Sequence, residues 1–490
     1  MATAAATELE KPAGIDWPAV ARDLRAVVDP QFVIEDRETL APYECDGLSM
    51  YRELPRLVVL PDTVEQAQAV LAYCHARGIP VVARGAGTGL CAGAMPHAGG
   101  IVLSLARFDR ILALDPQSRT ARVEPGVRNL AISEAAAAHG LFYAPDPSSQ
   151  IACTIGGNVA ENAGGVHCLK YGLTVHNLLA VKLLTVEGEL LTVGSGGLDA
   201  CGFDLLALVT GSEGLLGVVV EVTVKLLPLP EHARLVVAGF DAVEKASEAV
   251  SRIIAAGIVP GGLEMMDKAA IGAAEAFVGA GYPTDAEALL LCELDGPAEE
   301  VEELCERVTG LMRSLGAFDV RASISEAERA LWWKGRKSAF PAVGRIAPDY
   351  YCMDGTIPRR HLATVLTKIS ALSEQYGLGV ANVFHAGDGN LHPLILFDAN
   401  VSGEFEKAEA FGAAILELCV SVGGCITGEH GVGLEKIRQV PLQFSEQELT
   451  QLGMIKLAFD PGETLNPGKG IPILGRCQEY RALESAGRRG

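Results

Sequence analysis

The chain has 490 residues, 49% of them hydrophobic, which provides core for two or more globular domains of about 100–200 residues each. Its 40 Lys and Arg against 61 Asp and Glu give a formal net charge of -21, which argues against nucleic acid and anionic lipid surfaces as partners. Residues 1–15 lack the apolar core of a secretory signal and are typical of a mobile tail, and no apolar run reaches the roughly 18–20 residues of a membrane span. The 12 cysteines include no C-x-x-C pair, so neither an iron–sulfur ligand run nor a disulfide framework is indicated. We expect a cytoplasmic protein with reduced thiols.

After an N-terminal lead (residues 1–51, with a helix at 17–28), alternating strand and helix patterns predict one α+β domain over residues 52–230. Its clearest unit is a strand at 57–60, a helix that follows the N-cap residue Thr63 and ends at Gly78, and a strand at 79–83. The further elements expected before Pro228 are strands at 101–104, 110–114, 120–124, 178–185 and 215–224 and a helix at 130–139.

A glycine-rich loop, Arg84-Gly-Ala-Gly-Thr-Gly89, follows directly on one of these strands. Successive glycines let backbone N–H groups approach a phosphate without interference from a Cβ atom. A nicotinamide-type dinucleotide site is a weaker interpretation, because the residues from Leu90 onward are a poor helix start and the next strand arrives too soon for a crossover helix. A plain structural turn is the other alternative.

Two more loops of this composition lie in the same domain, at residues 154–165 and 211–214. They are rich in Gly, Thr and Asn, and three such loops exceed what chain reversal alone requires. Together they predict a large cofactor that carries a pyrophosphate.

Beyond residue 230, longer amphipathic helices alternate with strands, which predicts a substrate or cap domain over residues 231–425 with an antiparallel sheet covered by helices. The elements expected in it are helices at 242–256 and 298–315 and strands at 234–238, 288–294 and 380–384. The C-terminal segment, residues 426–490, is expected to return to the active site before it ends in a polar tail.

The stretch His385-Ala-Gly-Asp-Gly-Asn-Leu-His392 is the most informative part of this second domain. Asp388-Gly389 is a strong signal for a two-residue type I′ turn, because both of its positions need a positive φ. Such a turn places His385 directly opposite His392, with Cβ atoms about 4.5–5.5 Å apart. At this spacing both imidazoles can hold one metal ion.

A later cluster, Glu429-His430, can join this pair, since it also lies beyond an apolar run and between glycines. The runs that flank the hairpin, 380–384 and 394–397, are apolar, which predicts that the histidines are buried. A buried His or Glu is unusual unless it is paired or ligated. A metal or catalytic role is therefore favoured over the alternative that the histidines are polar decoration of a hairpin.

Five motifs, taken in order, resemble those of the FAD-linked oxidases of the vanillyl-alcohol oxidase type. They are Arg84-Gly-Ala-Gly-Thr-Gly89, Thr154-Ile-Gly-Gly-Asn158, Gly214-Leu-Leu-Gly-Val218, His385-x6-His392 and Gly428-Glu-His-Gly431. Within that family they are most similar to the branch of glycolate oxidase D subunits and D-lactate and D-2-hydroxyglutarate dehydrogenases. The resemblance covers about residues 40–475. It implies a two-subdomain α+β FAD-binding domain near residues 52–230, followed by the cap domain.

The resemblance also implies which residues hold FAD. The pyrophosphate side takes Arg84, Gly85, Ala86, Gly87, Thr88 and Gly89; the flavin side Pro145, Asp146, Thr154, Gly157, Asn158, Asn162 and Gly165; and the adenine side Val218 and Val219. Relatives with covalent flavin carry a His in the first loop, where this chain has Thr88. The FAD is therefore expected to be non-covalent.

By the same resemblance His385, His392 and Glu429 are metal ligands and His430 is the catalytic base. Two imidazoles and a carboxylate suit a divalent ion, with zinc expected and manganese or iron as alternatives. Arg336 matches the arginine that binds the substrate carboxylate, a task that suits the guanidinium fork. The residues alone leave open that Arg336 lies on a solvated face of a basic helix.

The expected reaction is oxidation of a small 2-hydroxy acid to the 2-oxo acid, with metal assistance, His430 as base and hydride transfer to flavin N5. Relatives specific for D-2-hydroxyglutarate carry a Lys where this chain has Cys352 and a polar residue where it has Leu394. These departures favour glycolate or D-lactate as substrate and leave D-2-hydroxyglutarate as the alternative.

Electrons must leave the chain, because it has no iron–sulfur ligand pattern of its own. The resemblance implies a flavoprotein-like and an iron–sulfur partner subunit, or a quinone or cytochrome acceptor, through which the cytoplasmic protein is peripheral at the inner membrane. A non-catalytic flavin subunit of an oxidase complex and a non-redox flavoenzyme that makes ether lipid precursors stay open as alternatives.

Overall fold

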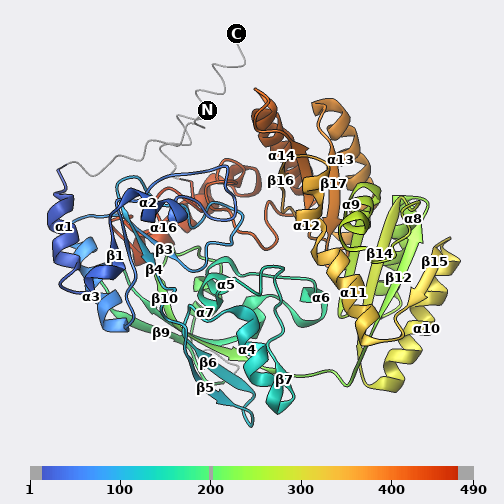
Figure 1. The fold of residues 1–490 in the computed structure, drawn as a ribbon, viewed down its shortest axis with the longest axis horizontal. Coiled ribbons are helices and arrows are strands. Elements are labelled where there is room, and N and C mark those ends of the chain that lie inside the picture. The colour runs from blue at the N-terminus through green and yellow to red at the C-terminus, as the bar shows by residue number, and fades with distance from the viewer. Residues whose placement is uncertain (1–13, 198–201, 473–490) are drawn as a thin grey trace. The chain divides into compact units, whose positions relative to one another are not determined.

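The computed structural model describes residues 14–197 and 202–472 and folds into two units, each assembled from separate chain segments (Figure 1). Unit 1 contains Met1–Ala163, Leu173–Pro228 and His430–Gly490, and unit 2 contains Gly164–Gly172 and Leu229–Glu429. The chain enters unit 2 for the second time at residue 229, close to the boundary expected at 230, but its first visit, at 164–172, falls inside the expected first domain. Most of the expected mobile tail and the polar C-terminal tail lie outside the described residues.

Unit 1 is built on a 4-stranded sheet of order β1-β2-β4-β3 and a 5-stranded sheet of order β5-β6-β10-β8-β9, as an α+β domain requires. The first sheet pairs β2 and β3 in parallel with β4, whereas neighbours in the second sheet are antiparallel. The strands of the first sheet are β1 (Val33–Ile34), β2 (Leu57–Val59), β3 (Val81–Arg84) and β4 (Ile101–Ser104). Those of the second are β5 (Ile111–Asp115), β6 (Thr120–Val123), β8 (Leu178–Leu184), β9 (Leu190–Gly194) and β10 (Val218–Lys225), and a short pair consists of β7 (Leu141–Phe142) and β11 (Leu227–Pro228).

The helices of unit 1 begin and end where local chemistry predicts. Thr63 Oγ1 accepts a hydrogen bond of 3.2 Å from Gln66 N at the start of α3 (Val64–His75), and Gly78 reverses the chain after it with a φ of 61°. The other helices are α1 (Trp17–Leu24), α2 (Arg37–Leu40), α4 (Asn129–Ala136), α5 (Ile155–Glu161), α7 (Leu205–Val209), α15 (Val440–Gln443) and α16 (Glu446–Phe459). The C-terminal segment joins this unit, because Leu465 forms a parallel bridge with Val81 at the edge strand β3.

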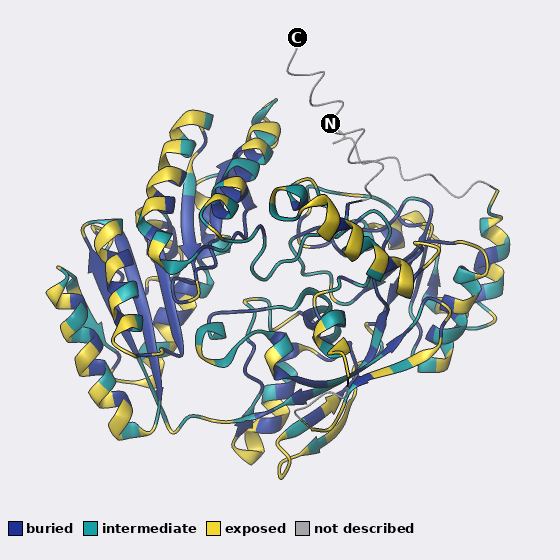
Figure 2. Ribbon diagram, turned by 180° about the vertical axis from the view of Figure 1, so that it is seen from behind, coloured by how far each residue is buried: buried dark blue, intermediate teal, exposed yellow. Residues whose placement is uncertain are grey.

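Unit 2 contains the predicted antiparallel sheet, which has 7 strands in the order β15-β12-β14-β13-β17-β18-β16. Its strands are β12 (His232–Phe240), β13 (Gly262–Asp267), β14 (Ala288–Gly296), β15 (Phe318–Ala322), β16 (Asp349–Cys352), β17 (Val380–Phe384) and β18 (Pro393–Phe397). The strands are dark blue in Figure 2, whereas the helices beside them turn yellow faces outward, as expected for a sheet covered by amphipathic helices.

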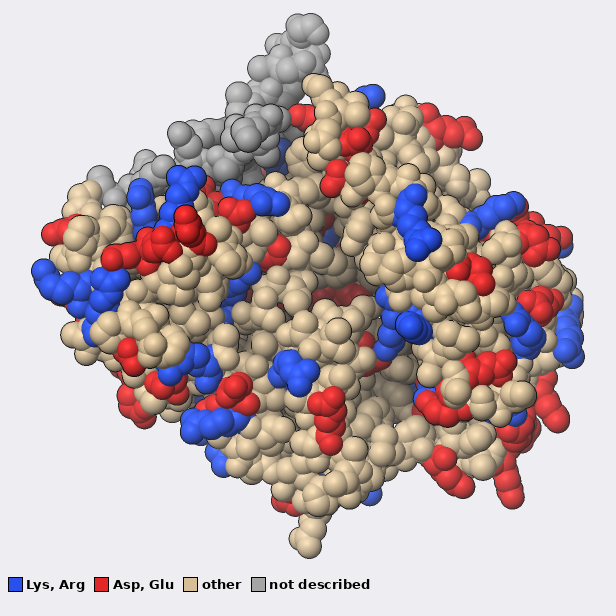
Figure 3. Space-filling model, in the orientation of Figure 1, with Lys and Arg blue, Asp and Glu red and all other residues tan. Residues whose placement is uncertain are grey.

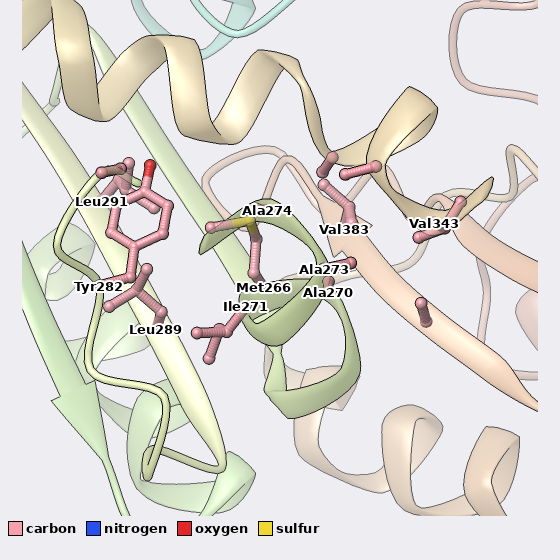
Figure 4. Packing of buried hydrophobic residues seen from close by; sticks show 14 of the residues in the cluster. Met266, Ala270, Ile271, Ala273, Ala274, Tyr282, Leu289, Leu291, Val343 and Val383 are labelled. Carbon is pink, nitrogen blue, oxygen red and sulfur yellow. The ribbon is translucent and has the colours of Figure 1, made fainter. Parts of the chain in front are cut away.

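The helices of unit 2 form two layers, one on each face of this sheet. One layer contains α8 (Val243–Ala255), α10 (Ala298–Ser314), α13 (Leu362–Tyr376) and α14 (Glu404–Ser421), and the other α9 (Lys268–Val278), α11 (Glu326–Lys337) and α12 (Ala339–Ala342). Under the second layer Met266, Leu289, Leu291 and Val383 from the strands pack against Ile271 of α9 (Figure 4). This core fixes the sheet face on which the polar residues described below lie.

The first visit of the chain to unit 2, residues 164–172 with α6 (Cys168–Tyr171), is held by two buried carboxylates of β14. His167 Nε2 lies 2.9 Å from Glu293 Oε1, and Lys170 Nζ donates to Asp295 Oδ1 over 2.9 Å. The hydroxyl of Tyr171 also donates to Asp295. We call residues 164–172 the strap.

Among the described residues no helix is both long and apolar enough to cross a bilayer. On the face shown in Figure 3, acidic and basic side chains are interspersed rather than gathered by sign.

Candidate metal centre and cofactor loops

The hairpin that carries the histidines has a longer turn than the sequence predicts. His385 pairs with Asn390, with His385 N donating to Asn390 O over 3.0 Å, and Asp388 does not have a positive φ. The predicted type I′ turn and the His385–His392 pairing are therefore wrong. Asp388 Oδ1 instead accepts from Asn390 N at 3.1 Å, a side-chain turn that Asp favours. The pairing differs by two residues, and because strand side chains alternate with a period of two, both histidines still face the same side.

The two imidazoles and Glu429, which we call the histidine cluster, bring their ligand atoms within 4.8 Å of one another. His385 Nε2 and His392 Nε2 each lie 3.3 Å from Glu429 Oε1, and the ring centroids are 5.1 Å apart. Ligands at 2.0–2.2 Å from a tetrahedral ion stand roughly 3.3–3.6 Å from one another. The donor set and its spacing therefore fit a divalent ion, as the sequence predicts for these three residues.

Asp354, which the sequence analysis missed, holds the loop that supplies Glu429. Its carboxylate accepts from Thr427 Oγ1 at 2.6 Å, from Gly428 N at 3.0 Å and from Glu429 N at 3.2 Å. Its Oδ1 also lies 3.4 Å from His392 Nε2. Asp354 lies two residues beyond the end of strand β16, and a carboxylate near a strand end is a signal that identifies it only once the sheet order is known.

A second missed carboxylate, Glu264 of β13, lies behind His385. Its Oε1 is 2.8 Å from His385 Nδ1, and its side chain is fully buried. Burial opposes ionisation, but His385 and Arg336 hold the pKa of Glu264 below its ordinary value. Burial likewise opposes the charged form of His385, but Glu264 and Glu429 raise its pKa well above the ordinary value. The carboxylates around His385 thus favour a positive charge beside them.

Arg336 is 1% exposed, which excludes the solvated helix face that the sequence left open. It follows Trp332 by one helical turn on α11, so both side chains point into the core. Its Nη2 forms an ion pair with Glu264 Oε2 over 2.6 Å, and none of its three guanidinium nitrogens has a hydrogen-bond partner among the described residues. Buried donors without partners are rare, and these are suited to a planar anion such as a carboxylate.

Cys352 and Leu394, the two departures from the hydroxyglutarate pattern, are neighbours across strands β16 and β18. Both are buried, and Leu394 lies two residues after His392 and therefore on the same face of the sheet. The ring of Phe340 also packs against His392, with centroids 6.0 Å apart. The sheet beside the histidine cluster is therefore apolar at these positions.

His430 directly follows Glu429 and is the first residue of the third segment of unit 1. Because it is adjacent in sequence to a candidate metal ligand, it is placed as the sequence predicts for a base beside a metal.

In unit 1, the first two glycine loops lie against each other, since a Cβ at Gly85 would touch Thr154 Oγ1. Gly87 has a φ of 69° and packs under the guanidinium of Arg84, which donates to Cys45 O at 2.7 Å. Thr154 Oγ1 is buried and has no hydrogen-bond partner among the described residues. Small residues next to an unsatisfied hydroxyl fit a bound phosphate group, so these loops are compatible with the predicted pyrophosphate site.

The asparagines of the second loop hold the backbone in place. Asn158 Oδ1 accepts from Asn129 Nδ2 at 3.0 Å, and the same amide donates to Pro145 O at 3.0 Å. Asn162 ends α5 with a φ of 51°, and its Oδ1 accepts from Val175 N at 3.0 Å. Asn129, which the sequence analysis missed, therefore links two of the predicted flavin residues.

The remaining predicted cofactor residues differ in how deeply they are buried. Thr88 and Gly89 are half-buried and Ala86 is exposed, whereas Val218 lies in the hydrophobic core of unit 1. Val219 and Asp146 are half-buried, and a Cβ added at Gly157 would lie 3.5 Å from Thr154 Oγ1. Gly165 belongs to the strap, so the structure places it in unit 2 rather than with the other loop residues.

Unit 1 also contains a second buried group of ionisable residues, which we call the lysine cluster: Asp46, Cys91, Glu161, Glu213 and Lys469. The ligand atoms of Cys91, Glu161 and Glu213 lie within 4.8 Å of one another. Glu213 accepts from Val432 N at 2.7 Å and from Gly433 N at 2.6 Å. Burial and the neighbouring Glu213 raise the pKa of Glu161 well above its ordinary value, and burial lowers the pKa of Lys469 to about 8.

Two family models match the chain. The model described as FAD binding domain covers residues 55–194, and the model described as FAD linked oxidases, C-terminal domain, covers residues 229–470. The first thus includes two of the predicted cofactor loops, and the second includes the histidine cluster.

Individual proteins match over nearly the whole chain. Glycolate oxidase subunit GlcD of Escherichia coli K12 is 63% identical over 96% of this chain and 94% of its own length. The subunit of the same name from Bacillus subtilis is 38% identical over 87% and 91%, and D-lactate dehydrogenase of Archaeoglobus fulgidus is 34% identical over 84% and 90%. Among solved structures, p-cresol methylhydroxylase shares the fold with a TM-score of 0.79, at 17% identity over 94% of this chain and 97% of that chain.

Proposed function

The chain belongs to the FAD-linked oxidase family, and from this premise we propose that it is the subunit of a 2-hydroxy-acid dehydrogenase that oxidises glycolate or D-lactate to the 2-oxo acid. The family and the named relatives support FAD-linked oxidation of a 2-hydroxy acid. One observation in unit 2 carries the narrower proposal. His385 and His392 converge on Glu429, while the buried guanidinium of Arg336 keeps N–H groups for a carboxylate.

Two bound groups, FAD and a divalent metal ion, take part in the proposed reaction. FAD is held without a covalent bond by the glycine loops of unit 1, and a divalent ion, zinc or else manganese or iron, is held by His385, His392 and Glu429. When bound, the ion supplies a Lewis acid that lowers the pKa of a ligated hydroxyl, and FAD supplies the acceptor for the hydride from the substrate Cα.

The side chains of the protein bind and deprotonate the substrate. Arg336 binds the substrate carboxylate through its Nε and Nη1, which the fold leaves free. His430 accepts the proton of the C2 hydroxyl on its imidazole as general base. Loss of that proton and of hydride from Cα leaves a C2 carbonyl, so the product is the 2-oxo acid.

The size of the substrate follows from the apolar sheet beside the histidine cluster. Phe340, Cys352 and Leu394 offer no positive charge to a second carboxylate, and burying an unpaired carboxylate costs several kcal/mol. Glycolate and D-lactate avoid this cost, whereas D-2-hydroxyglutarate does not.

The two electrons leave through another protein or a diffusible carrier. The name of the bacterial relatives, a subunit of glycolate oxidase, supports partner subunits for this chain too. We propose a flavoprotein-like and an iron–sulfur partner, or a quinone or cytochrome acceptor, with the chain cytoplasmic and peripheral at the inner membrane through such partners.

The decisive experiment is anaerobic bleaching of the bound flavin by glycolate, D-lactate, L-lactate and D-2-hydroxyglutarate. Glycolate or D-lactate should bleach the flavin fastest, and acid precipitation should release the flavin. Fastest bleaching by D-2-hydroxyglutarate would overturn the substrate assignment. No bleaching by any of the four acids would favour a flavin scaffold without chemistry of its own.

Arg336→Lys tests the carboxylate site, because it keeps the charge but removes the planar fork. We expect kcat/KM for glycolate to fall about 10- to 100-fold, mainly through KM. Lys334→Ala is the matched control, since it removes an exposed cation from the same helix and should leave kcat/KM unchanged. Equal kinetics in the two variants would remove Arg336 from the site.

A further inference from the structure

Glu264 is the buried residue that contacts both a candidate metal ligand and the candidate substrate arginine. Its Oε1 lies 2.8 Å from His385 Nδ1, and its Oε2 lies 2.6 Å from Arg336 Nη2. All three side chains are nearly inaccessible, with 1% exposure for Glu264 and Arg336 and 6% for His385. The carboxylate thus joins two parts of the proposed site that no backbone segment connects directly.

The register of the sheet fixes the Glu264–His385 contact. Strands β13 and β17 are antiparallel, with Met265 paired with Phe384 and Met266 with Val383. One further step along this register places Glu264 opposite His385, and opposed residues of neighbouring strands share one face. The contact is therefore set by the main chain and does not depend on a flexible side-chain approach.

This contact decides which nitrogen of His385 is free. Glu264 lies 2.6 Å from the guanidinium of Arg336 and is therefore held as a carboxylate, which accepts hydrogen bonds and donates none. His385 must therefore carry its proton on Nδ1, which leaves the lone pair of Nε2 on the side of Glu429, 3.3 Å away. Metal-bound histidines commonly use such a carboxylate to fix the ring and its tautomer.

The other oxygen of Glu264 orients Arg336. It forms an ion pair with Nη2 over 2.6 Å and offsets the charge of a guanidinium that would otherwise be buried without a counter-charge, an arrangement that costs several kcal/mol. Because this ion pair holds one edge of the planar group, the Nε and Nη1 donors keep one fixed direction.

We propose that Glu264 is a positioning residue that presents His385 Nε2 to the metal ion and the free N–H groups of Arg336 to the substrate carboxylate. The inference rests on the proposed function of these two residues. Metal binding and carboxylate binding then both depend on the same buried carboxylate. A substitution of Glu264 should therefore weaken metal binding more than it disturbs Arg336.

Glu264→Gln separates these effects because an amide has one accepting oxygen and one NH2 group. The charged guanidinium should take the oxygen, since charge-assisted hydrogen bonds are roughly twice as strong as neutral ones. The NH2 group then faces His385 Nδ1, which must accept and carry its proton on Nε2 instead. We expect the dissociation constants of Zn²⁺ and Mn²⁺, measured by competition with a chelating dye on the full chain, to rise about 10- to 100-fold.

Glu293→Gln is the matched control, because Glu293 is also a buried carboxylate of unit 2 but pairs with His167 and Arg329. Its metal dissociation constants should stay within about threefold of the wild type even if its melting temperature falls. A folded Glu264→Gln protein with wild-type metal affinity would overturn the inference and leave the proposed function intact. A wild-type chain that binds neither ion would overturn the metal centre and the inference together.

A measurement on the wild type keeps the test valid if Glu264→Gln does not fold. Two-bond ¹H–¹⁵N correlations of ¹⁵N-histidine-labelled, zinc-loaded protein report the tautomer of His385, assigned by comparison with His385→Gln. A protonated Nδ1 and a metal-bound Nε2 would support the inference. A proton on Nε2 would overturn it.

Discussion

The histidine cluster and the lysine cluster both bring three possible metal ligands within 4.8 Å, yet they are charged differently. In the lysine cluster, Glu213 accepts two backbone N–H bonds, and Lys469 donates to Gly93 O at 2.9 Å and to Asn466 Oδ1 at 2.7 Å. The fold thus provides its own cation and donors there. In the histidine cluster, two imidazoles face a carboxylate across 3.3 Å, and Glu264 adds a second negative charge behind one of them. Proximity of ligand atoms alone does not identify a metal site; the balance of charge around them does.

The largest effect is expected from a substitution in the histidine cluster. His392→Ala removes one of the three proposed ligands, so bound Zn²⁺ or Mn²⁺ should be lost and glycolate-driven flavin bleaching should fall at least about 100-fold, while FAD stays bound. Metal analysis and stopped-flow absorbance measure the two losses. Cys91→Ser makes the corresponding change in the lysine cluster and should alter neither quantity. Loss of metal from Cys91→Ser, with retention in His392→Ala, would reverse the comparison.

A smaller effect is expected when the balance of positive and negative charge in the lysine cluster is changed. Lys469→Met removes one of the two buried lysines, Lys436 being the other, whose charges offset Glu213, and this should lower the free energy of unfolding by up to about 3–5 kcal/mol near neutral pH without changing metal content. Burial raises the pKa of Glu161 and of Glu213, so both are protonated in acid and need the cation less. Denaturant unfolding should therefore show a smaller loss at pH 5 than at pH 7.5. An equal loss at both pH values would mean that Lys469 acts through its hydrogen bonds rather than its charge.

The smallest expected effect concerns Glu293 in unit 2, a buried carboxylate whose charge is offset by cationic side chains of the protein itself. Burial raises its pKa, but His167, Arg329 and the indole of Trp333 more than offset this and lower it to about 2. Because the folded pKa is below the unfolded value, the stabilisation is complete above about pH 4.5 and is lost as the pH falls toward 2. Glu293→Gln should cost up to about 3 kcal/mol at neutral pH and progressively less in acid, as followed by thermal unfolding. A cost that does not change with pH would exclude this origin.

Sequence patterns predicted the ends of many elements because capping and periodicity are local. The helix after Thr63 and the strand at residues 380–384 lie where expected, and the antiparallel sheet of the second unit was also predicted. The histidine pair was found in spite of a wrong turn, since a two-residue shift of register leaves both side chains on one face.

What the sequence could not predict depends on contacts between distant segments. Glu264 and His385 are 121 positions apart, and their contact appears only when β13 is known to lie beside β17. The one visible signal was an acidic residue in the otherwise apolar run Gly262-Leu-Glu-Met-Met266. The burial of Arg336 could not be predicted for a similar reason. In a helix with several Lys and Arg residues, the buried face can be identified only when the sheet that it packs against is known.

The strap was also outside the reach of sequence patterns, for another physical reason. Its residues, including Gly165, follow a glycine loop of unit 1 without any break in composition. The ion pairs of His167 and Lys170 with carboxylates of β14 assign it to unit 2. Long-range charge pairing of this kind has no periodic signature along the chain.

The segmental composition of unit 1 has a consequence for synthesis on the ribosome. Lys469 donates to Gly93 O, which lies just after the first glycine loop and 376 positions away along the chain, and Leu465 bridges Val81. A nascent chain that has reached Glu429 holds every segment of unit 2, but unit 1 still lacks its last 61 residues. Domains that fold during translation do so as their segments emerge, at about 5–20 residues per second. Unit 2 is therefore complete first, and the residues just after the first glycine loop gain their contact with Lys469 only once that residue has emerged.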